Sequence, residues 1–434
     1  MNFYSTNNPS GRVSMEEALL RSQPADRGLY MPETIPFLGA DFFHSISGGT
    51  LADIGFQISS ALFKDAIPVS RLEELVHQAL PFDTPVVALE VGKTHVLELF
   101  HGPSLAFKDV GARYMAAMMG YFLEKSNREV HILVATSGDT GGAVAMGFLG
   151  VPGIKVTILY PSGRVSELQE KQLTTLGQNI TAIEIDGSFD DCQDLVKTAF
   201  TDVELNQEFS LASANSINIF RLIPQSFYYV RAFGQVKHLG KPVVFSTPSG
   251  NFGNLSAGAL AYKMGLPVAQ FIAATNLNYV VPKYLKTGLY SPNPSVETIS
   301  NAMDVGNPSN FVRLVHLFDD NFETLKQQLS GYFFDDEQTR QAMAEVYQQF
   351  GYVMCPHTAV GYLGLRSYQQ ANPDVCGIAL ATAHPAKFKD LVESVIHKPV
   401  EIPVALEELM SRTKQSVRMK ADFADFKEFL LQTA

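Results

Sequence analysis

The fold class is decided by the stretch Val134-Ala135-Thr136-Ser137-Gly138-Asp139-Thr140-Gly141, in which an apolar strand runs into a Ser-Gly turn and then a helix of small residues. The same layout returns at Ser246-Thr247-Pro248-Ser249-Gly250-Asn251-Phe252-Gly253. In each copy the glycines let backbone amides approach a ligand, and a helix N-terminus lies behind them. Both junctions are therefore predicted to bind a phosphate or a carboxylate without a charged side chain.

Seven unbroken apolar runs extend this layout along the chain. Strands that are buried on both faces have continuous rather than alternating hydrophobic residues, and helix-length stretches separate the runs. The runs are 96–100, 130–135, 155–160, 180–185, 243–247, 268–274 and 377–383. The sequence thus predicts an α/β core with a parallel sheet.

The remaining segments are organised around this core. Residues 1–85 have helix-like segments broken by Pro and Gly turns, which predicts a mainly helical N-terminal unit. Residues 277–339 are less regular, and Pro282, Pro292, Pro294 and Pro308 interrupt them. This segment is predicted to be an insertion or lid, and a long surface excursion without a function fits it as well.

Composition and charge exclude several function classes. The 434 residues carry 33 Lys and Arg against 44 Asp and Glu, a formal net charge of −11, which argues against a nucleic-acid or membrane partner. No apolar stretch reaches the roughly 18 residues that a membrane span needs. Cys192, Cys355 and Cys376 form no C-x-x-C pair, so neither a disulfide framework nor a zinc site is expected. We expect a cytoplasmic protein without a metal.

Several common catalytic motifs are missing from the sequence. It has no G-x-x-x-x-G-K-[ST] phosphate loop, no G-x-G-x-x-G after a strand, no G-x-S-x-G elbow and no H-E-x-x-H pair. Nucleoside triphosphatases, Rossmann dehydrogenases, serine hydrolases and zinc proteases are therefore disfavoured.

The first candidate for chemistry is Lys108, which ends the run Phe100-His101-Gly102-Pro103-Ser104-Leu105-Ala106-Phe107-Lys108. It falls at the start of a predicted helix, whose positive dipole end disfavours an ammonium group, and apolar residues precede it. Both effects favour the neutral, nucleophilic amine. The alternative is an inert surface lysine.

Four further segments are candidates for binding. Residues 249–254 suit an anion, and a turn with an Asx cap is the alternative. Residues 136–140 suit a carboxylate, although Asp139 would repel one and fits better as a helix cap. Arg221 follows polar residues in an apolar stretch, so it must be paired or face a ligand. The last segment, Thr382-Ala383-His384-Pro385-Ala386-Lys387-Phe388, could also be a plain turn with a capping Thr.

Together and in this order, these segments resemble the fold-type II pyridoxal-phosphate enzymes, and specifically the threonine synthases of the longer bacterial and fungal type. The resemblance extends from Tyr4-Ser5-Thr6 to the segment 384–388. It implies two open parallel-sheet α/β domains with the cofactor between them. The large domain would comprise residues 86–124 and 206–400, the smaller substrate-closing domain residues 125–205, and a helical tail residues 401–434.

The resemblance also implies roles for particular residues. Lys108 matches the lysine that forms a Schiff base with pyridoxal 5'-phosphate and then acts as the catalytic base. Thr382 matches the residue whose hydroxyl meets the pyridine nitrogen. The loop for the cofactor phosphate would be Ser249, Gly250, Asn251, Phe252, Gly253 and Asn254. The substrate carboxylate would meet Thr136, Ser137, Gly138, Asp139 and Thr140, and the substrate phosphate Ser216, Asn218 and Arg221.

The implied reaction converts O-phosphohomoserine and water to threonine and phosphate, by γ-elimination followed by addition of water at Cβ. Lys108 would shuttle the protons, and closure of one domain over the other would keep bulk water out. Two alternatives stay open. One is a pyridoxal-phosphate-dependent phospho-lyase or dehydratase that releases a 2-keto acid, and the other is a cofactor-free phosphate-binding module. A monomer and a homodimer are both compatible with the sequence.

Overall fold

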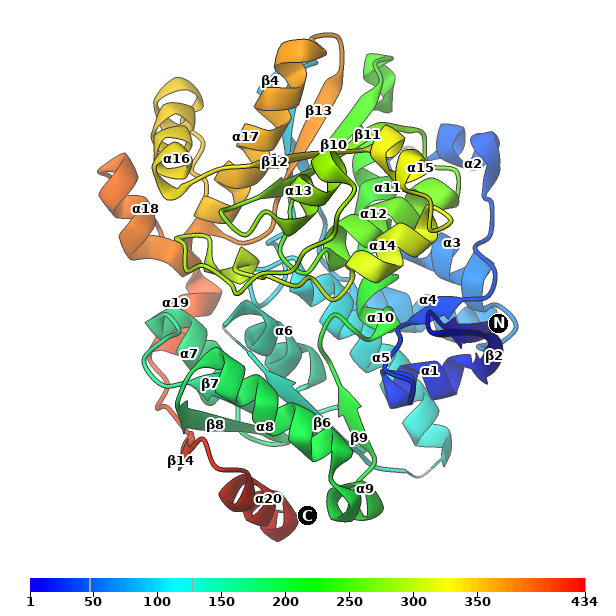
Figure 1. The fold of residues 1–434 in the computed structure, drawn as a ribbon, viewed down its shortest axis with the longest axis vertical. Coiled ribbons are helices and arrows are strands. Elements are labelled where there is room, and N and C mark those ends of the chain that lie inside the picture. Colours follow the sequence, from blue (N-terminus) through cyan, green and yellow to red (C-terminus); the bar gives the residue numbers. More distant parts are fainter. Residues whose placement is uncertain (47, 127, 137, 434) are drawn as a thin grey trace. The chain divides into compact units, whose positions relative to one another are not determined.

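The computed structural model describes residues 1–46, 48–126, 128–136 and 138–433. Its chain divides into two compact units (Figure 1). The first unit comprises Met1 and residues 31–107 and 222–401, and the second comprises residues 2–30, 108–221 and 402–434. Both contain a mainly parallel sheet with helices, so the predicted α/β class is confirmed.

The first unit is built on a six-stranded sheet of order β12-β11-β10-β13-β5-β4. Five strands are parallel, and β4 runs antiparallel at one edge. The bounds are β4 (Val86–Glu90), β5 (Thr94–Glu98), β10 (Val243–Pro248), β11 (Val268–Thr275), β12 (Leu329–Phe333) and β13 (Cys376–Ala381). Every residue of β10 and β13 is buried, as their continuous apolar sequences predict.

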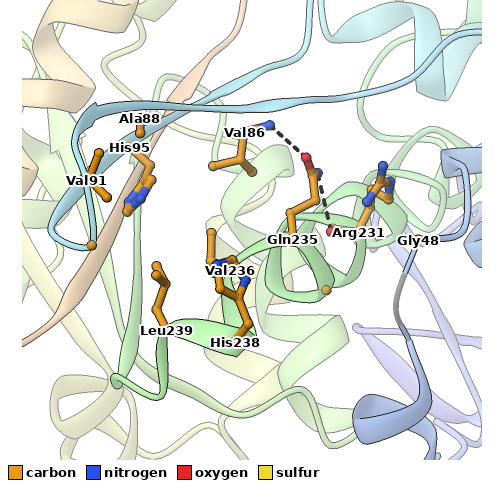
Figure 2. A pocket seen from close by; sticks show the side chains of 12 residues that line it. Gly48, Val86, Ala88, Val91, His95, Arg231, Gln235, Val236, His238 and Leu239 are labelled. Carbon is orange, nitrogen blue, oxygen red and sulfur yellow. Dashed lines mark hydrogen bonds between the residues drawn. The ribbon is translucent and has the colours of Figure 1, made fainter.

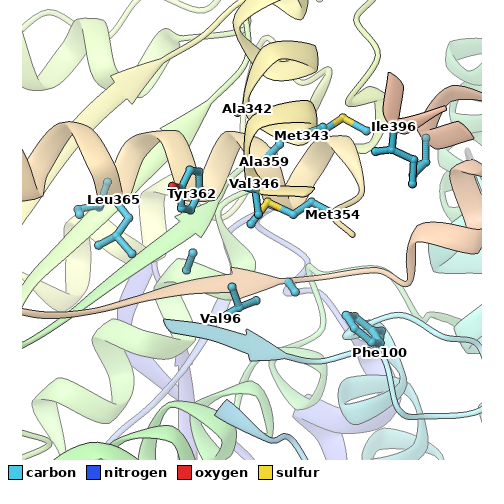
Figure 3. Close-up of a cluster of buried hydrophobic side chains, with 14 of the residues drawn as sticks. Val96, Phe100, Ala342, Met343, Val346, Met354, Ala359, Tyr362, Leu365 and Ile396 are labelled. Atoms are coloured by element: carbon cyan, nitrogen blue, oxygen red, sulfur yellow. The ribbon is translucent and has the colours of Figure 1, made fainter. Parts of the chain in front are cut away.

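Helices cover this sheet. They are α2 (Gly39–Ser45), α3 (Leu51–Phe63), α4 (Val69–Ala79), α11 (Gln225–Val236), α12 (Gly253–Lys263), α13 (Val280–Thr287), α14 (Phe311–Leu317), α15 (Phe322–Gln328), α16 (Asp336–Phe350), α17 (Pro356–Ala371) and α18 (Lys389–Ile396), with short 3-10 turns at Lys237–Leu239, Asn301–Met303 and Pro385–Phe388. Figure 3 shows apolar side chains of α16 and α17, such as Met343 and Leu365, gathered over the strand that carries Val96. Each such side chain contributes about 1.5–3 kcal/mol when it is fully buried.

The second unit contains a five-stranded parallel sheet of order β14-β8-β7-β6-β9. Its strands are β6 (Val130–Ala135), β7 (Ile154–Pro161), β8 (Ile180–Asp186), β9 (Leu211–Ser213) and β14 (Val417–Lys420). The helices are α1 (Met15–Arg21), α5 (Lys108–Ser126), α6 (Asp139–Phe148), α7 (Glu167–Thr174), α8 (Phe189–Thr201), α9 (Val203–Glu208), α10 (Ile219–Leu222), α19 (Val404–Met410) and α20 (Phe423–Gln432). A small sheet of order β2-β1-β3 is formed by β1 (Asn2–Ser5), β2 (Asn8–Ser14) and β3 (Tyr30–Pro32).

The contact-based units differ from the predicted domain boundaries at the N-terminus. Residues 1–85 do not form one unit, because α1 packs against α5 and β9 of the second unit. They also begin with two paired strands, β1 and β2, rather than with a helix. The predicted assignment of residues 108–124 to the large domain differs as well, because α5 packs on α6.

Two segments are more regular than predicted. The tail of residues 401–434 contains a strand, β14, which pairs with β8, and Phe426 and Leu430 of α20 enter the core of the second unit. The segment 277–339 contains α13, α14, α15 and β12, and β12 extends the parallel sheet beside β11. Pro282 does not prevent α13, because it lies in the first turn, where the helix needs no amide hydrogen from it.

Candidate active site

Lys108 is the first residue of α5, the position at a helix start that the sequence predicts. The loop before it is fixed to the end of β13: the amide of Phe107 donates to the carbonyl of Thr382 at 2.8 Å, and the amide of His384 donates to that of Leu105 at 3.0 Å. Leu105 adopts a left-handed φ of 56° to make the turn. Backbone pairing in the first unit thus fixes the residue that precedes Lys108.

The segment after β13 carries three polar side chains with different environments. Thr382 is buried, and its hydroxyl has no hydrogen-bond partner among the described residues. Burial lowers the pKa of His384 to about 4, so the imidazole is neutral, and its Nδ1 accepts from the amide of Ala386 at 3.1 Å. Lys387 is only 1% exposed, and its Nζ donates to the carbonyl of Ser104 at 2.9 Å. The Thr382 hydroxyl is thus available to a ligand.

The predicted cofactor-phosphate loop lies between β10 and α12. The amide of Ser249 donates to the carbonyl of Ala274 at 2.8 Å. Phe252 occupies the N-cap position of α12 with a left-handed φ of 61°, and its side chain makes no capping hydrogen bond. The first-turn amides of α12 therefore have no capping side chain. A Cβ on Gly250 would lie 2.9 Å from the carbonyl oxygen of Ala302, so the close packing here requires glycine.

Asn254 supplies a direct test of whether this loop fits a phosphate. Its Oδ1 accepts from the Tyr229 hydroxyl at 2.8 Å, whereas its Nδ2 is buried and has no partner among the described residues. A buried donor without an acceptor is costly, and an anion at the start of α12 would supply the acceptor. The residues present therefore fit a phosphate group.

The predicted carboxylate loop joins β6 to α6 in the second unit. The hydroxyl of Thr136 accepts from the amides of Gly138, at 3.0 Å, and Gly141, at 2.8 Å. Asp139 is the first residue of α6, and Gln169 Nε2 donates to its Oδ1 at 3.0 Å. The expectation that Asp139 caps the helix is wrong, because the N-cap position is Gly138 and the Thr136 hydroxyl receives a first-turn amide. Of the other predicted residues in this loop, Thr140 is half-buried, and Ser137 lies outside the described residues.

The predicted substrate-phosphate residues lie around α10. Ser216 is half-buried. Asn218 is fully buried: its Nδ2 donates to the carbonyl of Leu19 at 3.0 Å and to Ser22, and its Oδ1 accepts from Phe220. Both ends of this amide are engaged by protein groups, so the structure gives Asn218 a role in holding the loop.

Arg221 is also buried, and its Nη1 donates to the carbonyl of Ala214. Burial lowers the pKa of Arg221 to about 10, while the negative charge of Asp109 raises it. The guanidinium therefore stays protonated at neutral pH. Its predicted contact with the substrate phosphate stays a prediction.

Sequence reasoning gave no role to two residues that the structure places beside predicted ones. Tyr229 orients Asn254, and Lys387 holds the loop before Lys108. Lys387 lies inside the segment 382–388, between an apolar strand and Phe388, and this position in the sequence indicates that it is buried. Tyr229 gives no comparable signal, because it lies among other aromatic residues of an apolar helix.

A cavity of about 510 Å³ lies elsewhere in the first unit, between β4 and α11 (Figure 2). His95, Arg231 and Gln235 line it, and Gln235 accepts from the amide of Val86 at 2.9 Å. None of the predicted site residues lines this cavity. Among the described residues, no group of three or more His, Cys, Asp or Glu side chains could hold a metal ion, and no helix is long and apolar enough to cross a membrane.

Comparison with known proteins identifies the family. A family model described as pyridoxal-phosphate dependent enzyme matches residues 80–378. Models described as the threonine synthase N terminus and the threonine synthase C-terminal region match residues 2–80 and 358–430. Threonine synthase of Escherichia coli is 44% identical over 432 residues, which cover 99% of each chain, and that of Haemophilus influenzae is 42% identical over all of both chains.

Solved structures agree with these matches. The crystal structure of threonine synthase from Escherichia coli has a TM-score of 0.93 and 43% identity, with all of both chains covered. The structure of PLP-bound threonine synthase from Brucella melitensis has a TM-score of 0.94 and 32% identity, and covers 100% of this chain and 99% of that one. The cofactor-free alternative is therefore wrong. The chain belongs to the threonine synthase family, and it is a pyridoxal-phosphate-dependent enzyme that forms threonine.

Proposed function

We propose that the chain converts O-phosphohomoserine and water to threonine and inorganic phosphate, with Lys108 as the residue that bonds to the cofactor aldehyde and moves protons. The observation that carries this proposal is the backbone pairing of the loop 105–107 with residues 382–384. It holds Phe107, the residue before Lys108, beside Thr382, whose hydroxyl would meet the pyridine nitrogen.

When bound, pyridoxal phosphate supplies an electron sink for the substrate carbons. Residues 249–254 would hold its phosphate with the amides at the start of α12 and with Asn254 Nδ2. The Thr382 hydroxyl would hydrogen-bond the pyridine nitrogen. Because a hydroxyl, unlike a carboxylate, does not stabilise a pyridinium, Thr382 would keep the ring less charged.

The substrate would be held by the second unit. The N-terminal end of α6, with residues 136–140, would bind the carboxylate. The hydrogen bond from Gln169 would hold the Asp139 side chain, whose charge would otherwise repel the carboxylate. Arg221 and Ser216 would receive the phosphate, with Asn218 holding their loop. A guanidinium matches phosphate with a bidentate fork, which a protein of net charge −11 needs as a local cation.

Lys108 would carry the proton transfers. Its Nζ would remove the proton from Cα and then one from Cβ, which allows phosphate to leave from Cγ. It would then help to return a proton to Cγ before water adds at Cβ. A competing fate is early release as a 2-keto acid, so residues that exclude bulk water from the site would favour threonine.

The location and assembly belong to the same proposal. All three cysteines are buried and free, which supports a reducing cytoplasm. We expect a monomer or a homodimer, and sedimentation analysis of the purified chain would distinguish the two.

Borohydride reduction followed by peptide mass spectrometry tests the central assignment. The reduced cofactor should appear on Lys108, and Lys108→Ala should lose turnover while the protein stays folded. Threonine and 2-keto acid are measured in the same reaction. A label on another lysine, or turnover in Lys108→Ala without an added amine, would contradict the assignment.

A further inference from the structure

The segment 298–313, part of the predicted insertion, packs directly on the proposed cofactor-phosphate loop. The carbonyl of Asn251 accepts from the amide of Asn310 at 3.1 Å. The side-chain Oδ1 of Asn251 accepts from both the amide and the hydroxyl of Ser309, each at 3.1 Å. Both oxygens of the central loop residue are thus held by this segment.

Two further contacts fix the same loop. A Cβ on Gly250 would lie 2.9 Å from Met303 Cα, which shows how closely the segment approaches. The ring of Phe311 packs edge-on against that of Phe252 with a centroid distance of 5.9 Å. The loop therefore cannot shift without moving the segment 298–313.

The segment is itself anchored to the sheet. Asn276, which follows β11, donates to Asp304 Oδ1 at 2.8 Å, and the Thr298 hydroxyl donates to the same oxygen at 2.7 Å. The amide of Ala302 donates to His357 Nε2 at 3.2 Å. These bonds make the segment a rigid support for the loop rather than a free surface excursion.

Arg313 is the buried cation of this support. It lies on α14, is 1% exposed, and its Nη1 donates to Asn310 Oδ1 at 2.8 Å. Burial lowers its pKa to about 9, so it remains charged at neutral pH. Asn310 thus joins the guanidinium, through its side chain, to the carbonyl of Asn251, through its amide.

We propose that Arg313 is a positioning residue for the cofactor phosphate: through Asn310 it fixes the loop at Asn251, and its charge favours a dianion bound at the start of α12. A helix N-terminus supplies only about half a positive charge, which leaves most of the phosphate charge to be balanced. A buried cation acts over a longer distance than an exposed one, because water screens it less. The inference rests on the proposed assignment of residues 249–254 to the cofactor phosphate.

The test compares two probes that differ only in the phosphate. The full-length chain is freed of cofactor with hydroxylamine, and its affinities for pyridoxal 5'-phosphate and for pyridoxal are measured by absorbance titration. In Arg313→Met the affinity for the phosphorylated probe should fall about tenfold or more, and that for pyridoxal should stay within about twofold. Arg313→Lys should recover part of the loss, since it keeps the charge.

A matched control is Arg231→Met, because Arg231 lies in the same unit and is paired with Asp83 away from the loop. This variant should lose stability and keep the ratio of the two affinities. An unchanged ratio in Arg313→Met would overturn the inference, whatever happens to its thermal stability.

Two additional variants keep the test decisive. If Arg313→Met does not fold, Arg313→Lys and the exposed Ser309→Ala take its place, and unchanged ratios in both would overturn the inference. Gly250→Ala tests the underlying assignment separately, because its Cβ would push the loop itself. A ratio that changes in Gly250→Ala but not in the Arg313 variants refutes the inference alone, and an unchanged ratio in Gly250→Ala refutes the assignment of the loop.

Discussion

Replacing Arg221 with Met separates the two roles that a buried arginine can have at this site. Arg221 is 3% exposed and Asp109, whose charge it feels, is 0% exposed. Removing the Arg221 cation leaves the buried charge of Asp109 less compensated, and the loss of one partner from two buried opposite charges costs about 3–5 kcal/mol. Arg113 also feels the charge of Asp109, so this carboxylate keeps one cation and the lower value, about 3 kcal/mol, applies.

This loss of folding free energy corresponds to a fall in Tm of about 10 °C for a unit of this size. Loss of one charge-assisted contact to the substrate phosphate would cost a further 2–4 kcal/mol or so in the transition state, roughly a 30- to 1000-fold drop in kcat/KM. Calorimetry measures the first effect, and threonine formation well below the new Tm measures the second.

Inhibition by inorganic phosphate decides whether Arg221 contacts the substrate. Phosphate should compete with the substrate in the unchanged enzyme and much more weakly in Arg221→Met. The double variant Asp109→Asn with Arg221→Met should recover part of the stability without restoring the phosphate inhibition. Equal phosphate inhibition in Arg221→Met and the unchanged enzyme would refute the proposed contact and leave Arg221 a structural residue.

Three other predictions concern separate residues. Thr382→Asp should stabilise a pyridinium and raise the ratio of 2-keto acid to threonine, and an unchanged ratio and visible spectrum would remove Thr382 from the ring nitrogen. Lys387→Met should lower the free energy of unfolding by about 1.5–3 kcal/mol, because the carbonyl of Ser104 loses a charged donor. Lys389 is half-exposed, so the control Lys389→Met should change the free energy of unfolding by less than about 0.5 kcal/mol. Burial lowers the pKa of His131 from 6.5 to about 4, so as the pH falls the unfolded chain binds a proton at this residue before the folded chain does. The free energy of unfolding should therefore fall as the pH drops from about 6.5 to 4. His131→Gln should reduce this fall by about 3 kcal/mol, and an equally steep dependence of Tm on pH in the variant would disprove the effect.

The parallel strands could be predicted because burial on both faces leaves an unbroken apolar run. All seven predicted runs are strands, with bounds that differ by at most two residues. The strands that were not predicted are short or lie at a sheet edge. β14, for example, has the sequence Val417-Arg418-Met419-Lys420 and is mostly exposed, so nothing in its pattern distinguishes it from a loop.

The local geometry of the candidate site could be predicted where the backbone dictates the residue type. Gly250 and the start of α12 are in this class, as is the position of Lys108 at a helix start. Long-range pairing could not be predicted. Arg221 could be singled out because it is an arginine in an apolar stretch. Arg313 has the same surroundings, in Phe311-Val312-Arg313-Leu314. Only the folded chain shows that Arg313 is connected to the loop at Asn251 through Asn310.

The late position of β14 in the chain has a consequence for biosynthesis. In the five-stranded sheet, β14 is an edge strand that covers β8, although more than 200 residues separate the two in sequence. During translation β8 leaves the ribosome long before β14, so the hydrogen-bonding edge of β8 stays unpaired until β14 has been synthesised. An uncovered edge is a template for pairing with another chain. A premature stop codon before residue 417 would leave the edge of β8 permanently unpaired. Such a product should require chaperones or aggregate, even though every proposed catalytic residue had been translated.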